Sequence, residues 1–280
     1  MPSANAAPKI TPHEAAGLID DLSAIVARAA AAVLAYPFSE VARRVKADRS
    51  PVTAADLASE QIILERLAAL LPGLPVVAEE SAARATTPPG ASVALVDPLD
   101  GTKEFLAGRD EYSINLALVT DGVPVAGIIA APARGLMWRG VVGAVAERLR
   151  LAWNDGPNRA SERRAVRTRR PAPAELTVLT SRSHADPRTE ALIAGLPVAR
   201  RQRCGSALKF CWLAQGDADL YPRLSPVSEW DIAAGAAILV AAGGRVSDPH
   251  GLPLEFGRAD RRFIVEGFLA WGDPARATRA

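Results

Sequence analysis

The sequence predicts a mixed α/β protein whose first half is α+β and whose second half is α/β. Three observations favour this class: amphipathic helical patterns come first, short apolar runs typical of strands follow them, and strands alternate with helices toward the carboxyl end. The chain has 280 residues, close to the usual limit of one hydrophobic core. We therefore expect two lobes that share an interface.

Two helices are expected at the start of the first half. Between Leu18 and Leu34, apolar residues recur every three or four positions, and alanines fill the same face. A second helix begins at Thr53, which can cap the first turn, and Asp56 stands three residues later at the capping-box position. Pro72-Gly73 should end this helix.

Strands of one largely antiparallel sheet are expected next. The apolar runs that predict them are 74–78, 93–96, 112–119, 123–130 and a strand pair within 136–151. Asp121-Gly122 is a strong signal for a hairpin turn between two of these strands.

A segment rich in Arg, Pro, Asn and Ser, 154–173, predicts a connection between the lobes. The expected division is an N-terminal α+β lobe at residues 1–153, a connection at residues 154–174 and a C-terminal α/β lobe at residues 175–280. In the second lobe we expect strands at 176–180 and 218–221, and helices at 206–215 and 230–242, the last of which Gly243-Gly244 ends. Eight arginines lie between Arg148 and Arg170, and such a run usually forms a solvated loop.

Composition excludes several classes of function. The net charge of +2 is too small for a protein that coats nucleic acid or an anionic membrane. Cys204 and Cys211 are spaced for neither a redox pair nor a zinc site, which predicts a reducing compartment. The start of the chain lacks the pattern of a signal peptide, and no apolar stretch is long enough to span a membrane. We expect a cytoplasmic protein with no transmembrane segment.

The acidic turn from Asp97 to Thr102 carries most of the chemical information. It follows an apolar strand, Pro98 restricts its backbone, and Gly101 permits a tight approach. Asp97 and Asp100 can therefore converge at the end of the strand, with the Leu99 carbonyl between them. Oxygen ligands of this kind suit a hard cation such as Mg²⁺.

Two further acidic sites also stand at the ends of predicted elements. Glu79-Glu80 follows a strand, and Asp231 lies where a helix begins. If folding brings Glu79, Asp97, Asp100 and Asp231 into one cleft, their mutual repulsion would require a metal ion. Taken singly, each site has a plain structural alternative, namely a polar turn, a helix cap or a solvated acidic pair.

The same motifs resemble those of the inositol-monophosphatase superfamily, whose members are Mg²⁺-dependent, lithium-sensitive phosphatases. The residues that carry this resemblance run from Asp97 to Thr102 and from Trp230 to Gly235, preceded by the Glu79-Glu80 pair. Segments outside these motifs are most similar to 3'(2'),5'-bisphosphate nucleotidases of the CysQ type; they are 50–56, 103–105, 181–186, 205–211 and 220–223. The resemblance covers about Ile19 to Gly267 and implies a layered α/β/α/β/α sandwich.

The resemblance also implies roles for single residues. The implied magnesium ligands are Glu79, Asp97, the Leu99 carbonyl, Asp100 and Asp231. Thr102 would pair with Glu79 to position and deprotonate the attacking water, while Asp56 would orient a water on a weaker ion. The backbone amides of Gly101 and Thr102 would face the phosphate.

The resemblance further implies that five residues contact the nucleotide, namely Ser183, His184, Ser206, Lys209 and Arg223. It implies that Asp231 also faces the substrate. For Lys209, His184 and Arg223, a purely structural role is also open, as a snorkelling helix residue, a loop residue and an ion-pair partner respectively. We expect a monomer or a homodimer without a nucleic-acid partner, and leave peripheral association with the inner membrane open.

The implied reaction is Mg²⁺-dependent hydrolysis of adenosine 3',5'-bisphosphate to AMP and phosphate, which would recycle a product of sulfate assimilation. Two alternatives stay open. An inositol or sugar-phosphate phosphatase of the same superfamily would share the chemistry and differ in its pocket. A sensor of the bisphosphate nucleotide would bind without turnover, although Glu79, Asp97 and Asp100 are all of catalytically competent type.

Overall fold

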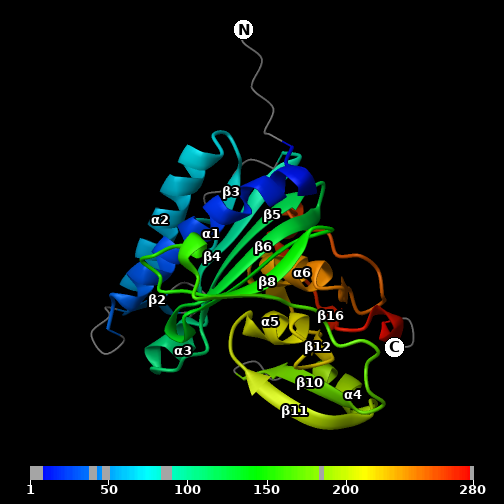
Figure 1. Ribbon diagram of the computed structural model, residues 1–280. Coiled ribbons are helices and arrows are strands. Elements are labelled where there is room, and N and C mark those ends of the chain that lie inside the picture. The colour runs from blue at the N-terminus through cyan, green and yellow to red at the C-terminus, as the bar shows by residue number, and fades with distance from the viewer. Residues whose placement is uncertain (1–8, 38–42, 46–50, 83–89, 183–185, 278–280) are drawn as a thin grey trace.

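Five layers of helices and sheets make up the protein (Figure 1). The computed structural model describes residues 9–37, 51–82, 90–182 and 186–277, together with the backbone of residues 43–45. Two helices cover one face of a seven-stranded sheet, and α5 and α6 lie between that sheet and a five-stranded one, whose far face carries α4. This order confirms the α/β/α/β/α sandwich.

The two predicted N-terminal helices are confirmed. Helix α1 (Pro12–Leu34) starts earlier than expected, because Thr11 and Glu14 form a capping box ahead of the apolar pattern. Helix α2 (Ala54–Leu70) begins at the predicted capping box, in which the Thr53 and Asp56 side chains each accept from the other's backbone amide. Both helices pack against the larger sheet.

The larger sheet contains the strands predicted in the first half, and only its first pair is parallel. Its members, in spatial order, are β3 (Val76–Ala78), β4 (Ser92–Asp100), β5 (Ser113–Thr120), β6 (Val123–Ala131), β7 (Leu136–Val141), β8 (Val145–Arg150) and β9 (Glu162–Ala165). The Asp121-Gly122 turn joins β5 and β6 as predicted, with both residues at positive φ. Almost every residue of β4, β5 and β6 is buried, because helices cover both faces.

Part of the Arg-rich connection is structured, so the expectation of a solvated loop is wrong for residues 162–165. These residues form β9, which adds an edge to the larger sheet through β8. Glu147 accepts a hydrogen bond from Arg163, and Glu162 accepts one from Arg148, so the arginines of the edge are partly neutralised. The division into lobes at residues 154–174 stays a prediction.

The second sheet has both parallel and antiparallel pairs. Its strands, in spatial order, are β11 (Val198–Cys204), β10 (Leu176–Ser181), β12 (Leu220–Arg223), β16 (Phe268–Trp271) and β14 (Arg245–Ser247). Strands β10 and β12 match the predictions. Helix α5 (Leu208–Ala214) lies within its predicted range, whereas α4 (Pro187–Ala194), β11, β14 and β16 were not predicted.

Helix α6 (Glu229–Ala241) connects the two sheets. It packs against β4, β5, β6 and β7 of the larger sheet and against β14 of the smaller one. Nine of its residues are buried, which explains why its sequence is apolar on every side. Gly243, at φ 98°, follows its end as predicted.

The remaining elements are short: β1 (Arg43–Val45) pairs with β2 (Pro51–Thr53), β13 (Val227–Ser228) pairs with β15 (Ile264–Val265), and α3 (Thr102–Leu106) follows β4. Within the described ranges, no helix combines the length and the apolar character that a membrane span requires.

Candidate active site

The acidic turn at the end of β4 is held in a tight conformation. The strand pairing with β5 shifts register between Asp97 and Asp100, so the two carboxylates do not alternate across the sheet as in a regular strand. The Leu99 amide donates to Asp97 Oδ1 over 3.0 Å. Gly101 has φ of 90°, and a Cβ there would lie 3.2 Å from the Glu111 carbonyl oxygen. The turn therefore requires glycine at this position.

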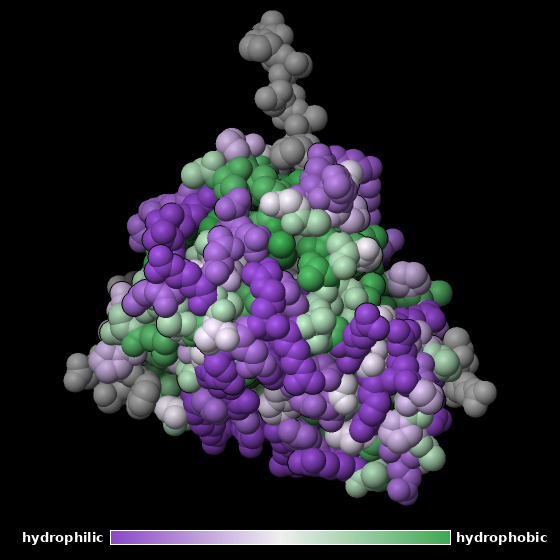
Figure 2. All heavy atoms as spheres, in the orientation of Figure 1, coloured by the Kyte–Doolittle hydropathy of each residue, from purple (hydrophilic) through white to green (hydrophobic). Residues whose placement is uncertain are grey.

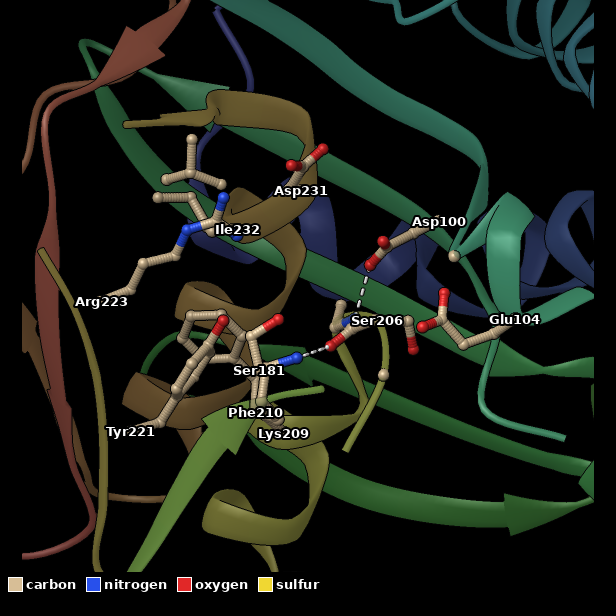
Figure 3. A pocket seen from close by; sticks show the side chains of 14 residues that line it. Asp100, Glu104, Ser181, Ser206, Lys209, Phe210, Tyr221, Arg223, Asp231 and Ile232 are labelled. Atoms are coloured by element: carbon tan, nitrogen blue, oxygen red, sulfur yellow. Dashed lines mark hydrogen bonds between the residues drawn. The ribbon is translucent and has the colours of Figure 1, made fainter. Parts of the chain in front are cut away.

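The fold brings the other predicted acidic residues to the same place. Glu79 directly follows β3, and its amide donates to the Val96 carbonyl oxygen because β3 is parallel to β4. Asp231 lies in the first turn of α6. Figure 3 shows that Asp100 and Asp231 line one cavity, which they approach from β4 and from α6.

The electrostatics show that these carboxylates form one cluster. Burial raises the pKa of Asp97 well above its usual range, and the charges of Glu79, Asp100 and Asp231 raise it further. The pKa of Asp231 is also well above its usual range, through burial and the charges of Asp100 and Glu79. Four acidic side chains from distant segments therefore repel one another, as the metal-site hypothesis requires.

Lys209 supplies a cation beside this cluster. It extends from α5, is only 3% exposed, and donates to the carbonyl oxygens of Cys204 and Ser206 over 3.2 and 2.6 Å. Burial raises the pKa of Asp100 to about 6, and the nearby Lys209 charge limits that rise. Asp100 also accepts a hydrogen bond from the Ala207 amide over 2.5 Å.

Thr102 and Asp56 are linked directly. The Thr102 hydroxyl is 3.1 Å from Asp56 Oδ1 and 3.2 Å from the Leu99 carbonyl oxygen, so it has an acceptor on either side. The structure thus links Thr102 to Asp56, and the expected joint action of Thr102 and Glu79 on the attacking water stays a prediction. Burial raises the pKa of Asp56, while its hydrogen bonds from Thr53 and Thr102 oppose that rise.

The donor set fits a hard divalent cation in its chemistry. It consists of carboxylates and the Leu99 carbonyl, and it contains no sulfur or imidazole ligand. Among the described residues, no three His, Cys, Asp or Glu side chains are already drawn together around one point as metal ligands. The raised pKa values of Asp97 and Asp231 nevertheless show that their ionised forms are disfavoured by burial and by one another, and a bound cation would relieve that cost.

Of the substrate residues expected from the sequence, Thr102 does not line the cavity beside Asp100, and the others divide into two groups. Gly101, Ser206, Lys209, Arg223 and Asp231 all line the cavity of about 130 Å³ beside Asp100. Ser183 and His184 lie outside the described residues. The Arg223 guanidinium reaches the cavity near Asp231 and donates to Ser225 Oγ and to the Pro226 carbonyl oxygen (Figure 3).

Sequence reasoning missed a link that holds the rim of the cavity. Glu111 accepts two hydrogen bonds from Arg182, at 2.8 and 2.9 Å, and one from the Gly205 amide at 3.0 Å. This pairing ties the segment after α3 to the turn that precedes α5. Glu111 and Arg182 are 71 residues apart, and no local pattern in the sequence predicts that they meet.

Comparisons with known proteins identify the family of the chain. Residues 19–274 match the model of the inositol monophosphatase family. A curated relative from Shigella flexneri, named 3'(2'),5'-bisphosphate nucleotidase CysQ, is 39% identical over 230 residues, which span 80% of this chain and 86% of that protein.

Two solved structures share the fold. The crystal structure of CysQ from Bacteroides thetaiotaomicron has a TM-score of 0.71 and 30% identity, and the match covers 93% of this chain and 97% of that one. An IMPase from Thermotoga maritima has a TM-score of 0.74 at 21% identity, with 94% of each chain covered. The chain belongs to the inositol monophosphatase family.

Proposed function

We propose that this protein is a metal-dependent phosphatase that hydrolyses the 3'-phosphate of adenosine 3',5'-bisphosphate, giving AMP and phosphate. The observation that carries the proposal is the cavity in which Asp100 and Asp231, two members of the acidic cluster, lie beside Lys209 and Arg223. Similarity to nucleotidases of the CysQ type supports the choice of substrate. In the reaction, the oxygen of water bonds to phosphorus, and the bond from phosphorus to the ribose 3'-oxygen breaks.

Mg²⁺ is the proposed metal, held by Glu79, Asp97, the Leu99 carbonyl, Asp100 and Asp231. When bound, the ion would lower the pKa of a coordinated water and neutralise charge on the phosphate. Phosphate-monoester hydrolysis needs rate accelerations of up to ~10²¹, and one general base supplies only ~10²–10⁴. Side chains without a metal would therefore fall far short.

Thr102 and Asp56 have a defined task in this proposal. The Thr102 hydroxyl donates its hydrogen bond to Asp56 or to the Leu99 carbonyl, so its oxygen can accept a hydrogen bond from water. Asp56 thereby fixes the orientation of Thr102, and Glu79 is the proposed base for the water proton. The amides of Gly101 and Thr102, at the start of α3, would face the phosphate oxygens.

Lys209 and Arg223, the two cations of the cavity, would favour a substrate that carries a second phosphate. The Arg223 guanidinium can bind a phosphate through two parallel hydrogen bonds, whereas the buried Lys209 amine offers a compact charge. Ser206 and the predicted contacts Ser183 and His184 would complete the nucleotide site. The link to sulfate assimilation, sensitivity to lithium, the cytoplasmic location and a monomeric or dimeric state stay predictions that belong with this proposal.

A substrate panel tests the proposal. We expect phosphate release from adenosine 3',5'-bisphosphate to require Mg²⁺ and to be inhibited by Li⁺, and to fall at least ~10³-fold in Asp100→Asn because a metal ligand is lost. Asp155→Asn is the matched control, since Asp155 is exposed and far along the chain from the cluster.

Three outcomes would contradict the proposal in different ways. Faster turnover of inositol 1-phosphate would assign the protein to the inositol phosphatases. Mg²⁺-dependent binding of the bisphosphate without release of phosphate would indicate a sensor. Wild-type turnover by Asp100→Asn would show that the acidic cluster is not the catalytic centre.

A further inference from the structure

A second hollow lies at the β8–β9 edge of the larger sheet, apart from the candidate active site. It has a volume of about 360 Å³, and its polar lining consists of Arg148, Arg164, Arg167, Gln215 and Asp217. It shares no lining residue with the cavity beside Asp100. Figure 2 shows hydrophilic residues gathered over the middle of this face, where β8 lies in Figure 1.

Strand pairing places two of these arginines side by side. Arg148 on β8 and Arg164 on β9 are direct partners in the antiparallel register. Residues directly opposite one another point to the same face of a sheet, and like charges in that position destabilise the pair. Both side chains line the hollow, and Arg167 adds a third guanidinium from the segment just after β9.

The arginines of the hollow are less well neutralised than their neighbours. Among the described residues, Arg164 and Arg167 have no ion-pair partner, whereas Arg163 pairs with Glu147 and Arg169 pairs with Asp219. Arg148 pairs with Glu162 over 2.7 Å, yet its Nε atom is buried and has no hydrogen-bond partner in the described part of the chain. Its pairing with Glu162 therefore leaves part of the Arg148 guanidinium without a partner.

Two carboxylates partly neutralise the charge of the three guanidinium groups. Glu162 is committed to Arg148, with Arg150 3.6 Å from its other oxygen. Asp217 accepts a hydrogen bond from the Gln215 amide, whose oxygen in turn accepts from Trp138. The hollow therefore has a net positive charge, and its free donors belong to arginine.

We propose that this hollow binds a small, multiply charged phosphate compound such as a diphosphate group. Arginine is suited to phosphate because its planar fork of donors matches two phosphate oxygens. The volume lies within the range of about 300–1,000 Å³ that is typical of small-molecule sites. Bound oxygens would screen Arg148 from Arg164.

Calorimetric titration of inorganic pyrophosphate in buffer with EDTA tests this site separately from the active site. Without a divalent ion, the acidic cluster beside Asp97 repels anions, so binding reports on the hollow. We expect one pyrophosphate per chain for the wild-type protein. In the double variant Arg164→Ala/Arg167→Ala, affinity should fall at least about tenfold, because charge-assisted hydrogen bonds are lost.

The control double variant is Arg159→Ala/Arg200→Ala. Both of its arginines are exposed and unpaired within the described residues, and neither lines the hollow. The control therefore removes two positive charges, as Arg164→Ala/Arg167→Ala does, but removes them elsewhere on the surface. Thermal denaturation of both variants verifies folding. An equal loss in the control, an unchanged affinity in Arg164→Ala/Arg167→Ala, or no binding by the wild-type protein at millimolar pyrophosphate would each overturn the proposal.

Discussion

Replacing Asp97 by Asn should stabilise the metal-free protein while it abolishes phosphatase activity. Asp97 is 1% exposed, and the charges that act on it come from Glu79, Asp100 and Asp231. The Leu99 amide donates to Asp97 Oδ1, and an asparagine oxygen can accept the same hydrogen bond. The substitution therefore removes a buried, repelled charge and keeps the local geometry.

The pKa of Asp100 gives the size of the stabilisation expected for Asp97→Asn. This pKa is raised from 3.8 to about 6 even though Lys209 is close to Asp100. A rise of about two in this pKa corresponds to about 3 kcal/mol of stability. Because Asp100 is partly exposed and solvent screens its charge, this figure is an upper value for that residue. Asp97 is more deeply buried, and carboxylates dominate the charges that act on it, so we expect Asp97→Asn to stabilise the metal-free protein by roughly 3 kcal/mol at pH 8. This corresponds to a rise in Tm of roughly 6–12 °C.

The pH dependence has a definite sign. Because the folded-state pKa of Asp97 is raised, its neutral form contributes stability that is complete below the unfolded pKa of about 3.9 and is lost as pH rises through the folded pKa. The variant should therefore exceed the wild-type protein in Tm at pH 8 and match it near pH 4.

Thermal unfolding in EDTA, followed by circular dichroism at both pH values, provides the measurement. Addition of Mg²⁺ should raise the Tm of the wild-type protein at pH 8, and should have little effect on Asp97→Asn, because the ion binds only the folded wild-type site. Exposed Asp155→Asn serves as the control. A variant less stable than the wild-type protein at pH 8, or equally stabilised at pH 4, would refute the reasoning.

Three further substitutions test the scaffold and the rim of the cavity. Gly127→Ala should destabilise the fold by about 3 kcal/mol or more in urea unfolding, because its Cβ would lie 2.2 Å from the Ala234 carbonyl oxygen; Gly17→Ala, with open space on α1, should instead stabilise by about 0.5–1 kcal/mol. Glu111→Ala should lower kcat/KM for the bisphosphate about tenfold, since it frees Arg182; unchanged kinetics would remove Glu111 from any positioning role.

Local signals in the sequence were sufficient where a short segment determines its own structure. The Thr53 and Asp56 capping box, the Asp121-Gly122 hairpin and the acidic turn at Asp97 all depend on residues within a few positions of one another. Such features follow from capping and turn chemistry, which act over one turn of backbone.

Edge strands and cross-chain contacts were not predictable in the same way. Strand β11 contains Arg200, Arg201 and Arg203 and is largely exposed, so its sequence lacks the apolar alternation of a strand. Strand β9 was missed for the same reason. The charge of Lys209 and the hydrogen bond from the Ala207 amide both act on Asp100, because the turn before α5 lies beside the end of β4, and no local pattern specifies this arrangement.

Lys209 makes the pKa of Asp100 rise less than the pKa of Asp97. This difference predicts how metal binding depends on pH. The amine limits the rise in the pKa of Asp100, whereas the main charges that act on Asp97 are those of Glu79, Asp100 and Asp231, so Asp97 keeps a proton to higher pH. A metal ligand must be ionised, so binding of Mg²⁺ should release a proton, and affinity should rise between pH 6 and pH 8. Titration calorimetry in two buffers of different ionisation enthalpy measures that release directly. Binding without proton release at pH 6 would show that the cluster is already fully ionised, and that the buried repulsion inferred from Asp97 does not exist.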